Sequence, residues 1–339
     1  MKRSLVRIGL AFCLAVVLAA CSAGPGYKMI KKIHVGGEGG WDYLTVDSEA
    51  RRLYVSHGSQ VVVIDIDADK VAGNIPDTQG VHGIALAPEL NRGFISCGKT
   101  NTAVIFDLKT LKSLGVVKTG KSPDAILYEP VSKTVFTFNG GSKDATAFSA
   151  ATGKSTGTIP LGGKPEFGAA DGTGKVYVNI EDTNEVAEID AKNLKVLRRF
   201  PLKPGEEPTG LAFDVKSRHI FSGCHNKLMV IIDADKGAVA ATVPIGSGVD
   251  AVWLDDGYAF SSNGEGTVSV VKEASKGKFE AVETIQTIKG SRTMAVDAKT
   301  HKLYLPTAQF EPAPETVKGQ PRKRPAMIKD TFEILVVGE

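Results

Sequence analysis

One pattern of short segments recurs roughly every forty-two residues along almost the whole chain. Its first segment is small and apolar, its third is rich in Val and Ile, and its fourth ends in Pro or Gly. Gly, Pro, Asn and Asp separate these β-rich runs, as is typical of strands and turns. The second segment centres on an aromatic residue in each of seven copies: Tyr54, Phe94, Phe136, Tyr177, Phe221, Phe260 and Tyr304. Seven repeats of four strands predict an all-β, seven-bladed β-propeller.

The last repeat is incomplete at its C-terminal end. It has a first strand at 294–297, a second at 302–305 and a third at 332–337, and then the chain stops. Residues 28–36 resemble fourth segments such as 241–246. We therefore predict that the N-terminal strand completes the last blade, because this leaves no open sheet edge in the ring. The predicted propeller covers 28–339, and two separate β domains are the alternative.

The first twenty residues have the composition of an export signal. Lys2, Arg3 and Arg7 precede an apolar run over 8–18, which is shorter than the ~20 residues that a membrane-spanning helix needs. Residues 18–21 read LAAC, which resembles the bacterial lipobox. That resemblance implies cleavage after residue 20, acylation of Cys21 and a short tether over 21–27.

A lipid anchor on Cys21 would place the protein in the cell envelope. Several acyl chains give stable anchoring, where one chain is marginal. Ser22 follows the modified cysteine, and by resemblance to enterobacterial sorting this permits export to the outer membrane, on its periplasmic side or at the cell surface. Ordinary secretory cleavage is the alternative.

The net charge of +3 comes from the leader. Without Lys2, Arg3 and Arg7, the chain has 38 basic and 38 acidic residues. Nucleic-acid-binding domains usually carry a basic excess, so nucleic acid is not an expected partner.

Two cysteines, Cys97 and Cys224, lie beyond the lipobox. The repeats place them on the second and fifth blades, nearly opposite in the ring. A disulfide needs Cα atoms within about 7 Å, so we expect both thiols to stay free.

The repeat resembles a known bacterial family. Residues 54–57 (YVSH), 60–65 (QVVVID) and 241–246 (ATVPIG) are similar to the "YVTN" repeat of YncE-like, surface-layer-type propellers, and the similarity extends over 27–339. The Gly-His and Trp-Asp pairs typical of WD40 repeats do not recur. Asn139 and Asn263 keep the consensus asparagine, whereas the other blades have His57, Cys97, Ile180, Cys224 and Thr307 there. The resemblance implies the fold and export, but many functions occur on this scaffold.

The position where each first strand enters the central channel defines a second repeated column, which we call the funnel rim. The seven rim residues, 40 to 43 positions apart, are Asp42, His82, Asp124, Glu166, Thr209, Asp250 and Arg292. Carboxylates gathered around one channel mouth repel one another unless a cation or ligand balances them. The rim is therefore the candidate ligand-binding site, and a divalent cation is a candidate cofactor. The alternative is that each side chain caps its own turn.

The ends of the second strands reach the same face of the ring. These secondary candidates are His57, Cys97, Asn139, Cys224, His225 and Asn263. A His/His/Cys group could bind zinc, but no short ligand spacing supports this, and we assign neither metal ligands nor catalytic residues.

Residues 306–331 form a long, proline-containing and basic segment within the last blade. Loops of this length are usually functional or disordered. This one would cover the funnel as a lid, contact a partner, or extend into solvent.

These features favour a monomeric, non-enzymatic binding or scaffold lipoprotein that uses the funnel for a protein or small-molecule ligand. A lactonase-like or other hydrolase is the first alternative, with the rim carboxylates, His82 and Arg292 as its reactive groups. Binding of a single-stranded nucleic acid or another polyanion through Arg322–Arg324 is the second.

Overall fold

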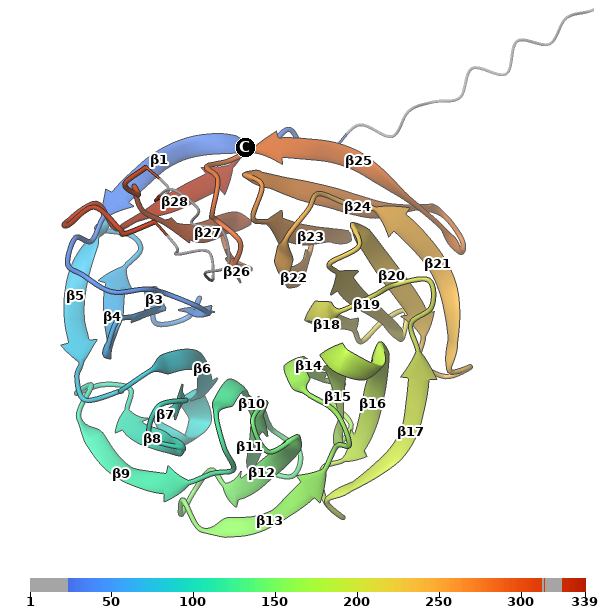
Figure 1. Cartoon of the computed structure of the whole chain (residues 1–339), viewed down its shortest axis with the longest axis horizontal. Coiled ribbons are helices and arrows are strands. Elements are labelled where there is room, and N and C mark those ends of the chain that lie inside the picture. Colours follow the sequence, from blue (N-terminus) through green and yellow to red (C-terminus); the bar gives the residue numbers. More distant parts are fainter. Residues whose placement is uncertain (1–23, 313, 315–324) are drawn as a thin grey trace, which may run out of the picture.

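The computed structural model describes residues 24–312, 314 and 325–339, and these form a ring of β-sheets around a central channel (Figure 1). Seven four-stranded antiparallel sheets are the blades of the ring. The leader and Cys21 lie outside the described residues. Among the residues that the structure describes, no helix is long and apolar enough to cross a membrane. The fold is the predicted seven-bladed β-propeller.

Each blade contributes one strand to each of four concentric layers. The inner strands are β2 (Leu44–Asp47), β6 (Val81–Ala87), β10 (Pro123–Glu129), β14 (Pro165–Ala170), β18 (Pro208–Asp214), β22 (Val249–Asp255) and β26 (Ala295–Asp297). The second strands are β3 (Arg52–His57), β7 (Arg92–Cys97), β11 (Thr134–Asn139), β15 (Lys175–Ile180), β19 (His219–Cys224), β23 (Tyr258–Asn263) and β27 (Lys302–Thr307).

The third and outer layers complete the blades. The third strands are β4 (Gln60–Asp65), β8 (Thr102–Asp107), β12 (Asp144–Ser149), β16 (Glu185–Asp190), β20 (Leu228–Asp233), β24 (Thr267–Ser275) and β28 (Glu333–Gly338). The outer strands are β5 (Lys70–Ile75), β9 (Ser113–Lys118), β13 (Ser155–Pro160), β17 (Lys195–Pro201), β21 (Ala238–Pro244), β25 (Lys278–Gln286) and β1 (Lys28–His34). Two short 3-10 helices, η1 (Pro88–Leu90) and η2 (Glu181–Thr183), lie in connections.

The N-terminal strand closes the ring as predicted. In the seventh blade β1 pairs antiparallel with β28, from Lys28 opposite Gly338 to His34 opposite Glu333 (Figure 1). A β-bulge interrupts this ladder between Met29 and Lys31. The outer strands of all the remaining blades also have a β-bulge against their third strands. Because β1 repeats this local irregularity, it is a regular outer strand of the repeat despite its distance in sequence.

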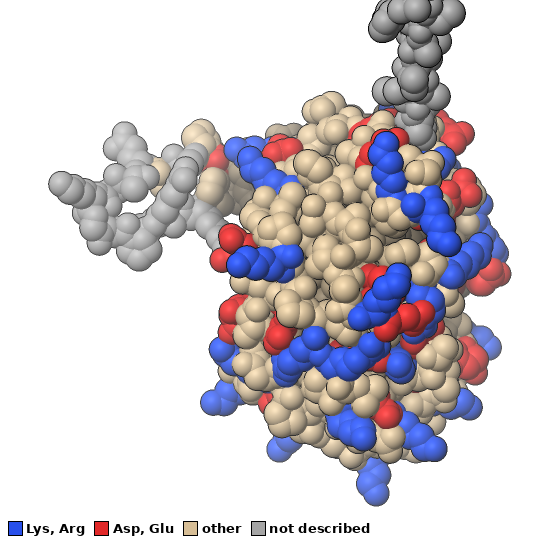
Figure 2. All heavy atoms as spheres, turned by 90° about the vertical axis from the view of Figure 1, so that its right-hand side faces the viewer, with Lys and Arg blue, Asp and Glu red and all other residues tan. Residues whose placement is uncertain are grey.

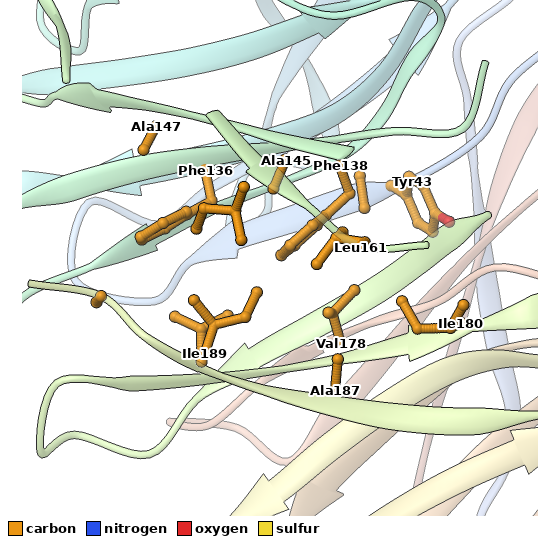
Figure 3. Close-up of a cluster of buried hydrophobic side chains, with 14 residues drawn as sticks. Tyr43, Phe136, Phe138, Ala145, Ala147, Leu161, Val178, Ile180, Ala187 and Ile189 are labelled. Carbon is orange, nitrogen blue, oxygen red and sulfur yellow. The ribbon is translucent and has the colours of Figure 1, made fainter. Parts of the chain in front are cut away.

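The hydrophobic core is divided among the boundaries between neighbouring blades and is not one central cluster. Seven clusters of buried side chains each join two neighbouring blades. In the cluster of Figure 3, Phe136 and Phe138 of β11 face Val178 and Ile180 of β15 across the boundary between blades three and four. Second and third strands are buried on both faces, which explains their continuous apolar runs in the sequence.

Acidic residues at the ends of third strands shape the turns that follow them. Asp65 Oδ1 accepts hydrogen bonds from the backbone amides of Asp67 and Ala68, at 3.0 and 2.8 Å. Asp107, Asp190 and Asp233 do the same in other blades. This self-capping is the usual role of aspartate at the first position of a turn.

Cys97 and Cys224 are both buried and free, on the second and fifth blades as expected. Burial raises the pKa of the Cys97 thiol to about 11 and that of Cys224 to about 12. Both are therefore packing residues in the reduced protein.

The connection between β27 and β28 begins and ends as a hairpin stem. The amide of Glu311 donates to the carbonyl of Ala326 at 2.8 Å, and Phe310 pairs with Met327 in a β-bridge. Trp41 packs against Phe310, with ring centroids 5.9 Å apart. The remainder of the predicted lid or arm, 313 and 315–324, lies outside the described residues, and so do Arg322–Arg324.

The segment before β1 lies along the outer edge of blade six. The amide of Gly26 donates to Glu283 of β25 at 3.0 Å, and Tyr27 stacks on Phe260 of β23 at 5.6 Å. The described chain therefore starts on the side wall of the ring.

Candidate functional site

The rim residues occupy an irregular stretch of backbone at the start of the inner strands. We call this side of the ring the top face. In β6, β10, β14, β18 and β22 the pairing with the second strand shifts register at or next to the rim residue. Asp42 and Arg292 precede β2 and β26. Such bulges re-aim side chains, so the rim residues are not ordinary members of the ladder.

Small polar side chains of the second strands hold the rim backbone. Ser56 Oγ accepts a hydrogen bond from the amide of Asp42 at 2.7 Å, and Ser96 Oγ accepts one from Gly83 at 2.8 Å. The hydroxyl of Ser262 donates to the carbonyl of Arg292 at 2.5 Å. Because these bonds satisfy the backbone, the charged side chains remain available to one another and to solvent.

Three rim residues from three successive blades converge at one point. His82 Nδ1 lies 2.6 Å from Asp42 Oδ2 and 3.5 Å from Asp124 Oδ1. Burial alone lowers the pKa of His82, but the hydrogen bond to Asp42 and the charges of both carboxylates outweigh it and raise the net value. The two carboxylates therefore favour the protonated form of the His82 imidazole.

The remaining charges form two further groups on the rim. Arg292 pairs with Asp250 and lies 3.7 Å from the other oxygen, Oδ1, of Asp42. Lys164 Nζ lies 2.6 Å from Glu166 and also pairs with Glu181, which begins η2. Five carboxylates thus face two permanent cations and one histidine.

Burial of the rim carboxylates disfavours their charged forms. Desolvation raises the pKa of Asp124 to about 6, that of Asp250 to about 7 and that of Glu166 to about 8. The charge on Asp42 adds to the shifts of Asp124 and Asp250, and the charge on Asp124 adds to that of Glu166. Carboxyls that titrate near neutral pH in a concave site are a physical mark of functional sites.

One rim residue is structural, although it bonds the next blade and does not cap its own turn. Thr209 is buried, and its hydroxyl donates to the carbonyl of Val249 at 2.8 Å. It is a structural residue and not a free ligand-binding group. Asp42, His82, Asp124, Asp250 and Arg292 instead pair with one another across blade boundaries.

Most of the secondary candidates are buried, and the two asparagines among them hold top-face loops. Asn139 donates to Asp144 at 2.7 Å and to Thr146 at 3.0 Å, and Asn263 makes the equivalent bonds in blade six. The ring of His57 is buried and stacks on Phe332 at 4.1 Å. Cys97 and Cys224 are buried as well. His225 alone of this set is partly exposed, and it lies 3.3 Å from Glu207.

Sequence reasoning missed Lys164, although a signal for it exists. The residues two positions before the rim are Gly40, Gly80, Ser122, Lys164, Glu207, Gly248 and Gly290. Lys164 is the only cation in that column. Its position lies outside the rim column, so the repeat of the rim residues alone does not reveal it.

A hollow of about 570 Å³ opens on the top face beside the Asp42–His82 pair. Trp41, Lys99 and Arg292 contribute side chains to its wall, together with the backbone of Gly40, Gly58, Gly80 and Gly98. A Cβ atom at Gly98 would lie 2.8 Å from His82 Nε2. The absence of a side chain there leaves room next to the imidazole.

Below the rim the channel becomes apolar. Tyr43 packs on Phe167 with ring centroids 5.3 Å apart, and a cavity of about 390 Å³ is lined by inner-strand residues such as Ile126, Phe213 and Trp253. Burial, together with the rim carboxylates, raises the pKa of Tyr43 well above its usual value. The rim charges therefore lie above an apolar section of the channel.

Among the described residues, Asp42, His82 and Asp124 form a group whose ligand atoms all lie within 4.8 Å of one another. His57 and Cys97 are not part of it. The His/His/Cys group considered from the sequence is thus not assembled among the described residues, and Asp42, His82 and Asp124 are the potential metal ligands that lie together.

Comparison with known proteins supports the fold. No protein-family model and no curated protein matches the chain. Among solved structures, the chain is similar to "Kuenenia stuttgartiensis Hydrazine Synthase", with 15% identity and a TM-score of 0.69 over 80% of this chain and 94% of that one. It is also similar to U3-55K, with 11% identity and a TM-score of 0.71 over 91% and 98%.

The WD40 repeats of RRP9 align equally well, with 9% identity and a TM-score of 0.72 over 91% of this chain and 97% of that one. At such low identities these likenesses concern the fold alone. The chain therefore shares the β-propeller architecture of these proteins.

Proposed function

We propose that this protein is an exported, lipid-anchored propeller of the YVTN-repeat type that binds a small polar ligand or a partner's polar group in its top-face funnel. The observation that carries this proposal is the rim itself. Charged side chains from several blades converge on one concave surface, and burial raises the pKa of three carboxyls toward neutral pH. A scaffold gains nothing in stability from such groups, whereas a bound ligand can compensate their charge.

The experiment compares the wild type with an Asp124→Asn/Glu166→Gln/Asp250→Asn variant of the mature chain. Melting temperatures are measured with a cationic, an anionic and a neutral probe: spermidine, citrate and N-acetylglucosamine. A ligand of the folded state raises the melting temperature by mass action. We expect at least one probe to do so in the wild type and not in the variant. If no probe shifts the wild type, or the variant shifts equally, the funnel is not the site.

The anchoring part of the proposal rests on the leader and the LAAC sequence. Two residues, 22 and 23, separate Cys21 from Gly24, and a three-residue step spans at most about 10 Å. An acylated Cys21 would thus hold the side wall near blade six close to the membrane. In a bacterial host, labelled palmitate should enter the wild type and a Cys13→Ala control but not Cys21→Ala. Labelling of Cys21→Ala would contradict the anchor.

One observation favours a hydrolase as the second candidate function. Asp42 orients the His82 imidazole at 2.6 Å, which is the arrangement of a histidine general base and its carboxylate. Hydrolysis of lactone or ester substrates that His82→Ala abolishes would support this candidate.

Polyanion binding has less support. On the side wall shown in Figure 2, Lys and Arg side chains are interspersed with Asp and Glu. On β17, Arg199 pairs with Glu185, and Arg198 pairs with the buried Glu188. Such paired charges do not make the basic stripe that polyanion binding needs.

A further inference from the structure

The imidazole of His82 cannot satisfy both carboxylates that it faces. Nδ1 carries at most one hydrogen, and the 2.6 Å contact with Asp42 uses it. Asp124 Oδ1 lies 3.5 Å away, is itself buried, and finds no hydrogen-bond partner within the described part of the chain. A buried carboxylate oxygen without a partner is costly. This arrangement therefore lacks one positive or hydrogen-donating group.

The neighbouring cations do not fill that place. Arg292 is engaged with Asp250, and Lys164 is engaged with Glu166 and Glu181. Tyr43 lies below the rim, where it packs on Phe167. An external cation between Asp42, His82 and Asp124 would supply the missing positive charge.

We propose that Asp42, His82 and Asp124 bind a divalent transition-metal ion, with zinc as the best match. An imidazole nitrogen and carboxylate oxygens about 2.0–2.2 Å from the metal are usual zinc ligands. Ligand atoms around such an ion lie roughly 3–4 Å apart, so the Asp42 and His82 groups need to separate by about 1 Å. Two carboxylates and a neutral imidazole balance the charge of the ion. The proton that His82 shares with Asp42 passes to solvent as the metal binds.

Three protein ligands leave at least one coordination position open, as in catalytic rather than structural zinc sites. The hollow beside His82 has Trp41, Lys99 and Arg292 in its wall. An oxygen donor with negative charge, such as a carboxylate, suits both the open position and these two cations. This last step rests on the proposed function, because it names the ligand class of the same funnel.

The test is isothermal titration of zinc into the metal-stripped mature chain. Variants are His82→Ala and Asp124→Asn, with His225→Ala as the control, since His225 is a partly exposed histidine of the same face that is not part of the group. We expect about one ion per wild-type chain and the same for the control. Removal of His82 should weaken binding at least about tenfold, because even indirect supports of a metal site cost that much.

A second readout keeps the test independent of folding defects. Cobalt substitution of the wild type and Asp124→Asn should give visible ligand-field spectra that differ, while melting curves in chelator establish that both are folded. A wild type that takes up no zinc, or a His82→Ala variant that binds as tightly, would overturn the metal site. If the titration detects no zinc binding, but citrate or spermidine still raises the melting temperature in the presence of chelator, the metal site fails and the proposed function stands.

Discussion

Replacing Ile33 with Ala tests whether the N-terminal strand is a true member of the seventh blade. Ile33 is 1% exposed, and it packs with Phe332, Ile334 and Val336 at the boundary between the last and first blades. Ile30, on the same strand, is 40% exposed and is the matched control. The two substitutions remove the same atoms from the same strand, but Ile33 is buried and paired with Ile334, whereas Ile30 is exposed and is the unpaired residue of the β-bulge.

The expected cost follows from the atoms removed. Ile→Ala deletes three carbons, or about 2.4 kcal/mol at ~0.8 kcal/mol each, and the cavity left behind adds to this within the usual range of about 2–5 kcal/mol. Ile30→Ala should stay within about 0.5 kcal/mol of the wild type. We therefore expect a difference of roughly 2–4 kcal/mol between the two variants.

Urea unfolding of the mature chain, followed by circular dichroism, measures this difference through the transition midpoint at constant slope. If Ile33→Ala is no more destabilised than Ile30→Ala, β1 does not pack as described and the ring is not closed by the N-terminus.

Three further predictions concern buried groups. Asp297 is buried, and Arg51 lies 2.7 Å from it. Arg51→Ala leaves the Asp297 charge unpaired, so it should lower the free energy of unfolding in urea by about 3–5 kcal/mol. Arg199→Ala removes only a surface ion pair and should cost less than about 1 kcal/mol. Burial raises the pKa of Glu166 from its ordinary value of 4.5 to about 8. Its stabilising contribution is therefore complete below the unfolded value near 4.5 and disappears as pH rises through about 8. Glu166→Gln should match the wild type at pH 4 and exceed its stability at pH 9 by up to about 5 kcal/mol, and equal stabilities at pH 9 would refute the shift. Cys97 and Cys224 are buried with raised pKa values, so a thiol reagent should modify them only at the rate of unfolding, and rapid modification of the native protein would contradict their burial.

The sequence was sufficient for the fold because its information is repeated seven times. An aromatic second strand, a Val/Ile third strand and an acidic turn recur at one period. Where the pattern of one repeat is ambiguous, the other repeats therefore indicate which residues form its strands. The closure by residues 28–34 was predictable because the last repeat lacks a fourth strand and only that segment resembles one.

The site was less predictable because pairing across blades depends on side-chain conformation. The rim column was correctly aligned, but the sequence does not indicate that His82 contacts Asp42 and Asp124 while Arg292 contacts Asp250. The secondary candidates were expected to reach the top face. Asn139 and Asn263 instead point into their own blades, because their amides satisfy loop and strand groups that sequence spacing does not reveal.

We propose that the rim charges serve ligand binding and not stability. The most direct measurement is the ligand-free unfolding free energy of the Asp124→Asn/Glu166→Gln/Asp250→Asn variant at pH 8. Since burial and mutual repulsion raise the pKa of all three carboxyls, we predict that the neutral variant is more stable than the wild type. Glu188→Gln is the contrasting control, because Glu188 is fully buried between Lys175 and Arg198 and its loss should destabilise the protein. If the rim variant is destabilised as Glu188→Gln is, the rim is a structural charge network and the case for a binding funnel fails.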